Sequence, residues 1–178
     1  MSEITPAAPS LVMDFVNTLD IESGTDAIDS PPALRRWIEQ RLGTRVRSVD
    51  DDAWRTVVAT RESLRQVLAS HSGAPLSRTA LGQLNRAGKR SEIRPQWDDR
   101  GAATFEPHDA GPYGALARIF AAVVAAQADE TWDRLKVCPA EDCRYAFYDH
   151  SRNRSGRWCS MRVCGNRAKT RTYRERHG

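Results

Sequence analysis

The four cysteines constrain this 178-residue sequence most, because all of them fall in one short stretch near the C-terminal end. They form two pairs, Cys138 with Cys143 and Cys159 with Cys164, with four residues inside each pair and fifteen between the pairs. Two short pairs with a hairpin-sized interval can bring four thiolates to the corners of a tetrahedron, which is the geometry of structural zinc. The spacing therefore predicts one structural Zn²⁺ held by all four cysteines, with no water ligand.

Two disulfides, or four unrelated thiols, are the alternatives to zinc. The sequence opens with Met1-Ser2-Glu3-Ile4 and lacks the basic and apolar segments of a signal peptide, so we expect a cytoplasmic, reducing location where disulfides are rare. No apolar run approaches the roughly 20 residues that span a bilayer, so we expect no membrane association. The expected reducing location favours zinc over disulfides.

Chain length predicts two domains. Residues 1–133 are numerous enough to bury about two thirds of their surface, and we expect them to fold without the rest of the chain. Residues 134–178 have few large aliphatic side chains and fall in the size range where a metal replaces a hydrophobic core. We expect a body at 1–133 that senses a ligand or dimerises, followed by a zinc finger at 134–178.

Charge divides the chain in the same place. Residues 134–178 contain twelve basic and four acidic residues, whereas residues 1–133 have a net charge of −4. Ten of the twelve basic residues are arginines, whose planar guanidinium binds pairs of oxygen atoms and stacks on rings. This asymmetry indicates an anionic partner for the C-terminal end, although a solvated basic tail would have the same composition.

Hydrophobic periodicity predicts a mainly helical body. Apolar residues at helical spacing, with capping signals, predict helices at about 11–19, 31–42, 48–71, 77–88 and 113–128. In the last of these, the residues expected to pack in the core are Leu116, Ile119, Phe120, Val123 and Val124. Residues 21–30 read as a polar loop, and residues 91–107 read as one small β-hairpin with Pro95 at an edge. The fold class is mainly α (α+β).

Asp14 and Asn17 lie on the polar face of the first predicted helix. Such a pair can line a ligand pocket in a sensor domain. Short polar side chains near helix ends also bond to neighbouring backbone, and this structural interpretation is favoured.

The finger is expected to resemble a treble clef, with a cysteine knuckle, a hairpin and a terminal helix. We expect residues 144–148 to pair with 157–160 around a polar tip at 149–156, and residues 165–176 to form the helix. Gly165 follows a ligand cysteine, where positive φ often turns N–H groups toward sulfur. Tyr148 and Trp158 are expected to be core rings of the finger.

The sequence from Phe147 to the terminal helix resembles the CGNR zinc-finger family. The residues that carry the resemblance are Phe147, Tyr148, Asp149, Ser151, Arg152, Asn153, Arg157, Trp158, Cys159, Ser160, Met161, Cys164, Gly165, Asn166, Arg167, Lys169, Tyr173 and Arg176. That family joins its finger to an N-terminal ABATE domain, described as a putative stress-induced regulator, whose opening motif is similar to residues 11–19. The resemblance implies a bacterial transcription regulator with a zinc-binding finger.

Duplex DNA is therefore the expected partner of the finger. The sequence does not identify an effector ligand for the body. The residues expected to contact DNA are Arg152, Asn153, Arg154 and Arg157 near the tip, and Arg167, Lys169, Arg171 and Arg174 on the helix. A zinc-stabilised protein-interaction module and a thiol redox sensor are the alternatives. An enzyme is not expected, because four thiolates leave zinc no open coordination position.

Overall fold

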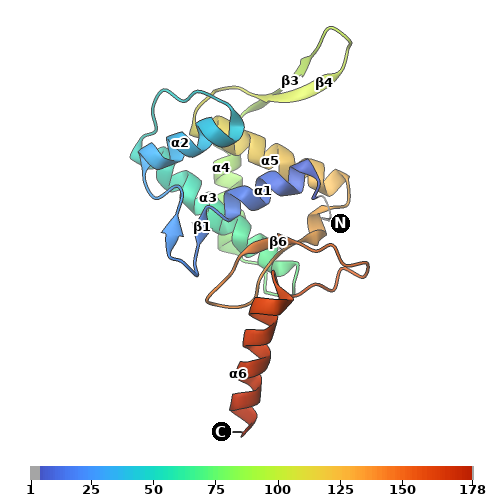
Figure 1. Ribbon diagram of the computed structural model, residues 1–178. Helices are drawn as coiled ribbons and strands as arrows, with labels where there is room; N and C mark the ends of the chain where they lie inside the picture. Colours follow the sequence, from blue (N-terminus) through green and yellow to red (C-terminus); the bar gives the residue numbers. More distant parts are fainter. Residues whose placement is uncertain (1–4, 178) are drawn as a thin grey trace.

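The computed structural model describes residues 5–177, and Figure 1 shows a helical body from which one helix and one hairpin project. The helices are α1 (Ala7–Val16), α2 (Pro31–Leu42), α3 (Asp51–Ser70), α4 (Arg78–Arg90), α5 (Pro112–Ala128) and α6 (Asn166–His177). The strands are β1 (Leu19–Asp20), β2 (Thr25–Asp26), β3 (Ile93–Trp97), β4 (Ala103–Pro107), β5 (Leu135–Val137) and β6 (Ala146–Tyr148). The strands form three short antiparallel pairs. The helices contain far more residues than these strands, so the mainly α class is confirmed.

Local signals account for several helix ends. Asp50 caps α3 by accepting a hydrogen bond from the Ala53 N–H at 2.7 Å, and Ser77 caps α4 in the same way through Ala80. Gly43 ends α2 with a φ of 64°, a left-handed conformation that glycine adopts without strain. The first helix ends at Val16, short of its predicted range of 11–19, because the chain turns at Thr18 into the short β1–β2 hairpin. Only β2 lies within the loop predicted at 21–30.

The core of the body lies where α1, α2, α3 and α5 meet. Its largest fully buried side chains include Phe15, Leu34, Leu64, Leu116 and Ile119. Burying a side chain of this size stabilises the fold by about 1.5–3 kcal/mol. In the part of the chain that the structure describes, no helix is both long and apolar enough to cross a membrane.

The outer side of α5 differs from its prediction. Phe120 and Val123 are only partly buried, and Val124 is 64% exposed. Phe120 and Val123 pack against the core with one side, and together with Val124 they line an open groove between α4 and α5. Helical spacing places Val124 next to the core stripe, but its side chain stays exposed.

The body and the finger share one hydrophobic core. Leu135, Val137 and Ala146, on β5 and β6, are at most 3% exposed and belong to the same cluster as Phe15 and Leu64. This shared core argues against a body that folds without the finger, an expectation that stays a prediction. The predicted boundary between residues 133 and 134 stays a prediction.

The finger's hairpin also differs from its prediction. Residues 146–148 pair with residues 135–137, with Lys136 opposite Phe147, and residues 157–160 form no strand. The knuckle from Cys138 to Cys143 is the connection of this hairpin, and the Cys138 N–H donates to the Tyr145 carbonyl at 2.9 Å. Because β6 pairs with β5, the segment just before Cys138, it packs on the core of the body.

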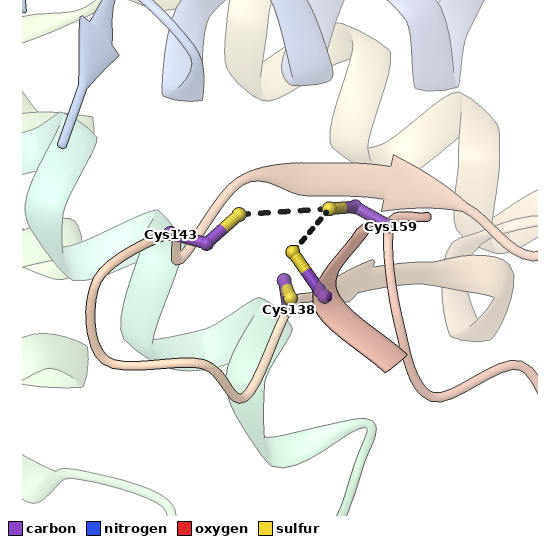
Figure 2. Close-up of side chains that lie close together, drawn as sticks. Cys138, Cys143 and Cys159 are labelled. Atoms are coloured by element: carbon purple, nitrogen blue, oxygen red, sulfur yellow. Dashed lines mark hydrogen bonds between the residues drawn. The ribbon is translucent and has the colours of Figure 1, made fainter. Parts of the chain in front are cut away.

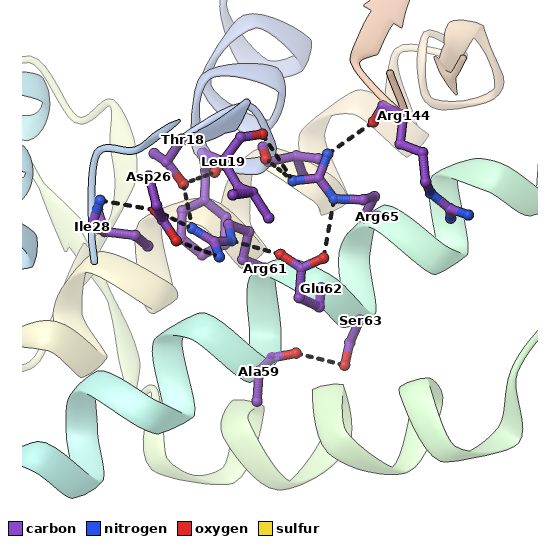
Figure 3. Close-up of polar contacts among 12 residues, drawn as sticks. Thr18, Leu19, Asp26, Ile28, Ala59, Arg61, Glu62, Ser63, Arg65 and Arg144 are labelled. Atoms are coloured by element: carbon purple, nitrogen blue, oxygen red, sulfur yellow. Dashed lines mark hydrogen bonds and ion pairs between the residues drawn. The ribbon is translucent and has the colours of Figure 1, made fainter. Parts of the chain in front are cut away.

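Two buried arginines join the elements around this core, as Figure 3 shows. Arg61 makes a bidentate ion pair with Asp26 on β2, at 2.7 and 2.9 Å. Arg65 donates to the carbonyl of Val16 at the end of α1 and to the carbonyl of Arg144 in the finger, at 2.6 and 2.8 Å. Their side chains are only 3% exposed, and Glu62 accepts from both.

Candidate metal centre and nucleic-acid interface

The four cysteine sulfur atoms converge on one point between the knuckle and the start of α6. All four lie within 4.8 Å of one another, and Figure 2 shows the thiols of Cys138, Cys143 and Cys159 facing a common centre. The Sγ atoms of Cys143 and Cys159 are 3.5 Å apart, and those of Cys159 and Cys164 are 3.6 Å apart.

These separations fit a tetrahedral zinc site. With Zn–S bonds of about 2.3 Å, the sulfur atoms of a regular tetrahedron lie roughly 3.8 Å apart. A disulfide requires about 2.05 Å, and all four cysteines are free thiols. The donor set and its geometry therefore provide the site for one structural zinc ion, in agreement with the sequence prediction.

The thiols are positioned by the knuckle, by an irregular segment and by a π-helical turn. Cys138 follows β5 directly, Cys143 ends the knuckle, and Cys159 lies in an irregular segment before Ser160. Cys164 lies in a π-helical turn, Met161–Gly165, that leads into α6 and is capped by the Ser160 hydroxyl. Trp158 and Ala140 pack around the sulfur atoms, so the expected role of Trp158 as a core ring is observed.

Burial makes the thiols of Cys143 and Cys159 poor acids in the absence of a metal. Desolvation raises the pKa of Cys143 to about 11 and raises the pKa of Cys159 as well. A bound Zn²⁺ supplies the positive charge that keeps such thiols as thiolates. Zinc binding is therefore coupled to proton release and to folding of the finger.

Arg167 lies beside the metal centre, and its half-buried side chain directs the guanidinium to a thiol and to two carboxylates. Its Nη2 atom donates to Cys164 Sγ at 3.3 Å, and its Nη1 atom lies 2.9 Å from Glu22 and 3.3 Å from Asp142. Burial alone would raise the pKa of Cys164, but hydrogen bonds from Arg167 and from the three neighbouring cysteine thiols together outweigh it and leave that pKa below its usual value. The guanidinium predicted to contact DNA is thus engaged with the metal centre and with the β1–β2 turn.

Gly165 does not have the positive φ expected from the sequence. The left-handed residue after a cysteine is Arg144, with a φ of 49°, in the knuckle. At Gly165, an added Cβ would lie 2.5 Å from Met161 Sδ and 3.3 Å from a Trp158 ring carbon. Glycine allows the π turn to pack closely against those two side chains.

A buried ion pair holds the tip loop at residues 149–156. Lys136 Nζ donates to Asp149 Oδ2 at 2.7 Å and to the carbonyls of Arg154 and Gly156. Burial would raise the pKa of Asp149, but hydrogen bonds from Lys136, Ser151 and Gly156 outweigh it and lower the pKa to about 2. The loop is therefore fixed from inside by Asp149, a residue of the CGNR motif, and by Lys136, for which the sequence pattern predicted no role.

The side chains predicted to contact DNA at the tip are exposed. Arg152, Asn153 and Arg154 lie on the outside of the loop, and Arg157 stacks on Trp158 with 5.3 Å between its guanidinium carbon and the ring centroid. Gly156 cannot carry a side chain without moving Asp149, because an added Cβ would lie 2.5 Å from the carboxylate.

Helix α6 projects from the body, as Figure 1 shows. Lys169, Arg171 and Arg174 are exposed on it. A cleft of about 470 Å³ separates α6 from residues 157–161, bordered by the rings of Trp158 and Tyr173 and by basic side chains that include Lys169. The described structure thus separates Arg167 from the other predicted helix contacts, which remain on the surface.

Asp14 and Asn17 are both engaged within the chain. Asn17 accepts from the Ala146 N–H at 2.7 Å and donates to the Ala146 carbonyl at 2.8 Å, in the manner of a paired strand. Asp14 forms an ion pair with Arg41 of α2. These contacts support the structural interpretation of the pair.

The sequence patterns did not identify the buried charged residues that support the site, which are Arg61, Arg65, Lys136 and Asp149. One signal existed for Arg61, which occupies a position in the apolar stripe of α3 where a charged residue requires a buried partner. Its partners come from distant segments, so the sequence pattern could not identify them.

A mainly helical domain carrying a four-cysteine zinc centre on its C-terminal segment defines the class: a zinc-finger protein. The family model described as "Putative stress-induced transcription regulator" (ABATE) matches residues 10–130, and the CGNR zinc-finger model matches residues 134–177. The chain therefore belongs to the ABATE family and carries a CGNR zinc finger. No curated protein matches it.

Proposed function

We propose that the chain is a zinc-dependent, DNA-binding transcription regulator of the cytoplasm, whose finger contacts duplex DNA. The observation that carries this proposal is α6, a 12-residue helix that projects from the body and contains five basic residues and one acidic residue. A helix of this length is about 18 Å long, and the major groove of B-DNA admits an α-helix.

The tip loop is the second proposed contact. Its backbone is held by the Lys136–Asp149 pair, so little ordering is needed when its exposed arginines meet phosphate. We assign phosphate contacts to Arg152, Arg154, Arg157, Lys169, Arg171 and Arg174, and base reading to Asn153. Arg167 is left out, because its guanidinium binds Cys164 and Glu22.

The test is a titration of zinc-loaded protein with fluorescent duplex DNA at two salt concentrations. If about four charges meet phosphates, a fourfold rise in salt should weaken binding about a hundredfold. Reversing Lys169, Arg171 and Arg174 to Glu should weaken binding to every sequence by at least about a hundredfold at low salt. The exposed arginines Arg35, Arg36 and Arg55 on α2 and α3, changed together to Glu, are the charge-matched control.

The result that overturns the proposal is absence of binding at low salt, or an equal loss in the control variant. Either outcome would favour the protein-interaction alternative, in which the finger docks on protein surfaces only. Asn153→Ala adds a separate readout, because loss of a base contact should reduce discrimination between sequences more than it reduces general affinity.

A further inference from the structure

The β3–β4 hairpin has one completely apolar face. Cross-strand neighbours share a face of an antiparallel pair, and the register places Ile93 opposite Pro107, Pro95 opposite Phe105, and Trp97 opposite Ala103. The other face carries the Arg94–Glu106 and Gln96–Thr104 pairs. The hairpin is therefore strictly amphipathic.

That apolar face is open to solvent. Trp97 is 63% exposed, Phe105 is 64% exposed, and Figure 1 shows the hairpin extending away from the helices. A two-stranded hairpin is only marginally stable in water and normally packs its apolar face on another element. Two large aromatic side chains on one exposed face indicate a partner surface.

The same chain contains a surface of matching chemistry. A groove of about 880 Å³ lies between α4 and α5, lined by apolar side chains that include Leu81, Leu84, Phe120, Val123 and Val124. Ile93, from the apolar face of the hairpin, lines the edge of this groove. Ile93 thus belongs both to the groove and to the apolar face of the hairpin.

The hairpin and the wall of the groove also carry net charges of opposite sign. Residues 92–107 contain four acidic and two basic residues, with Asp98 and Asp99 at the turn. Helix α4, which forms one wall of the groove, contains four basic residues and no acidic residue, and Lys89 lies at the groove itself. A hairpin entering this groove would bring acidic groups to a basic wall, whereas two hairpins packed face to face would bring like charges together.

We propose that the protein forms a twofold homodimer in which the β3–β4 hairpin of each chain lies in the α4–α5 groove of the other chain. Such an exchange is isologous and closes at two copies. The four aromatic rings offer on the order of 500 Å² of apolar surface, and the grooves that cover them offer a similar area. With the polar rim, the interface reaches the lower range of stable interfaces, about 1,200 Å².

The experiment measures the oligomeric state of the full-length, zinc-loaded chain by sedimentation velocity. The wild-type protein should form a dimer, and Trp97→Ser with Phe105→Ser should weaken it by at least about a hundredfold. Gln96→Ser with Thr104→Ser, on the polar face of the same hairpin, is the matched control and should leave the dimer unchanged. Val124→Asp, in the groove, should dissociate the dimer as the aromatic pair does.

A mixing experiment tests the exchange itself. An equimolar mixture of the hairpin variant and the groove variant retains one intact hairpin and one intact groove, so it should form a heterodimer although neither variant dimerises alone. The substituted side chains are largely exposed, and unchanged thermal unfolding would show that the variants fold. A wild-type protein that stays monomeric, or a mixture that stays monomeric, overturns the proposal. DNA binding is measured separately, so failure of either proposal does not decide the other.

Discussion

Arg167 shows how tertiary contacts change the role of a residue on a basic helix. From the sequence, it forms one stripe with Arg171 and Arg174. In the structure, its guanidinium contacts Cys164 Sγ and Glu22, whereas Arg171 and Arg174 are exposed. A cation beside a zinc-bound thiolate offsets part of the negative charge of four cysteines.

We expect Arg167→Ala to lower zinc affinity by about 10- to 100-fold, the usual effect of removing a group that supports a metal ligand. Competition with a chromophoric chelator measures this affinity. Arg171→Ala, one turn further along α6, removes the same side chain without contact to a thiol and should leave the affinity unchanged. Equal zinc affinities of the two variants would contradict a role for Arg167 at the metal centre.

At the scale of elements, the tip loop depends on one buried ion pair. The side chains of Lys136 and Asp149 are 7% and 2% exposed, and the loop amides of Ser151 and Gly156 donate to the same carboxylate. Because the folded pKa of Asp149 is about 2, below the ordinary value of 3.8, its ionised form stabilises the folded state. This stabilisation is complete above about pH 4 and is lost as the pH falls toward 2.

Asp149→Asn should therefore reduce the free energy of unfolding by at least about 2 kcal/mol at neutral pH. The reduction should be equal at about pH 7.5 and about pH 5.5, because the carboxylate is ionised at both. Denaturant unfolding of zinc-loaded protein measures it, with the exposed Asp133→Asn as a control that should change stability by less than about 0.5 kcal/mol. A penalty that disappears between these two pH values would exclude this account.

At the scale of the whole molecule, the finger completes the core of the body. Leu135, Val137 and Ala146 are buried against the helices, and the buried Arg65 and the half-buried Asn17 bond to finger backbone. Removal of residues 134–178 would expose part of the core and remove the partners of the Asn17 amide and of one Arg65 nitrogen atom.

We expect residues 1–133 alone to be less stable than the full chain by at least about 4 kcal/mol, a large part of the 5–15 kcal/mol typical of a domain. The control is a chain ending at Ala168, which retains all four cysteines and Arg167 but lacks most of α6. Thermal unfolding followed by circular dichroism should show a cooperative transition for the control only. Cooperative unfolding of residues 1–133 at the wild-type temperature would restore the view of an independent body.

The sequence by itself determined the local features of this protein. Helix ends depend on capping residues and glycines within a few positions, so Asp50, Ser77 and Gly43 could be read directly. The cysteine spacing predicted the zinc site, because a tetrahedral metal needs only four thiols that the chain can bring together. The β3–β4 hairpin was also predicted, since its strands adjoin in sequence and its turn contains Gly101.

Only the tertiary structure decided which distant groups meet. Arg61 and Arg65 are buried because carboxylates and carbonyls from other segments surround them, and no local pattern records those partners. Strand β6 pairs with β5 instead of residues 157–160, because the core accepts its apolar residues on that side. Val124 shares the helical periodicity of the core residues but is exposed, since burial depends on whether another element covers that face. Such outcomes depend on packing between segments far apart in the chain, which periodicity and spacing do not describe.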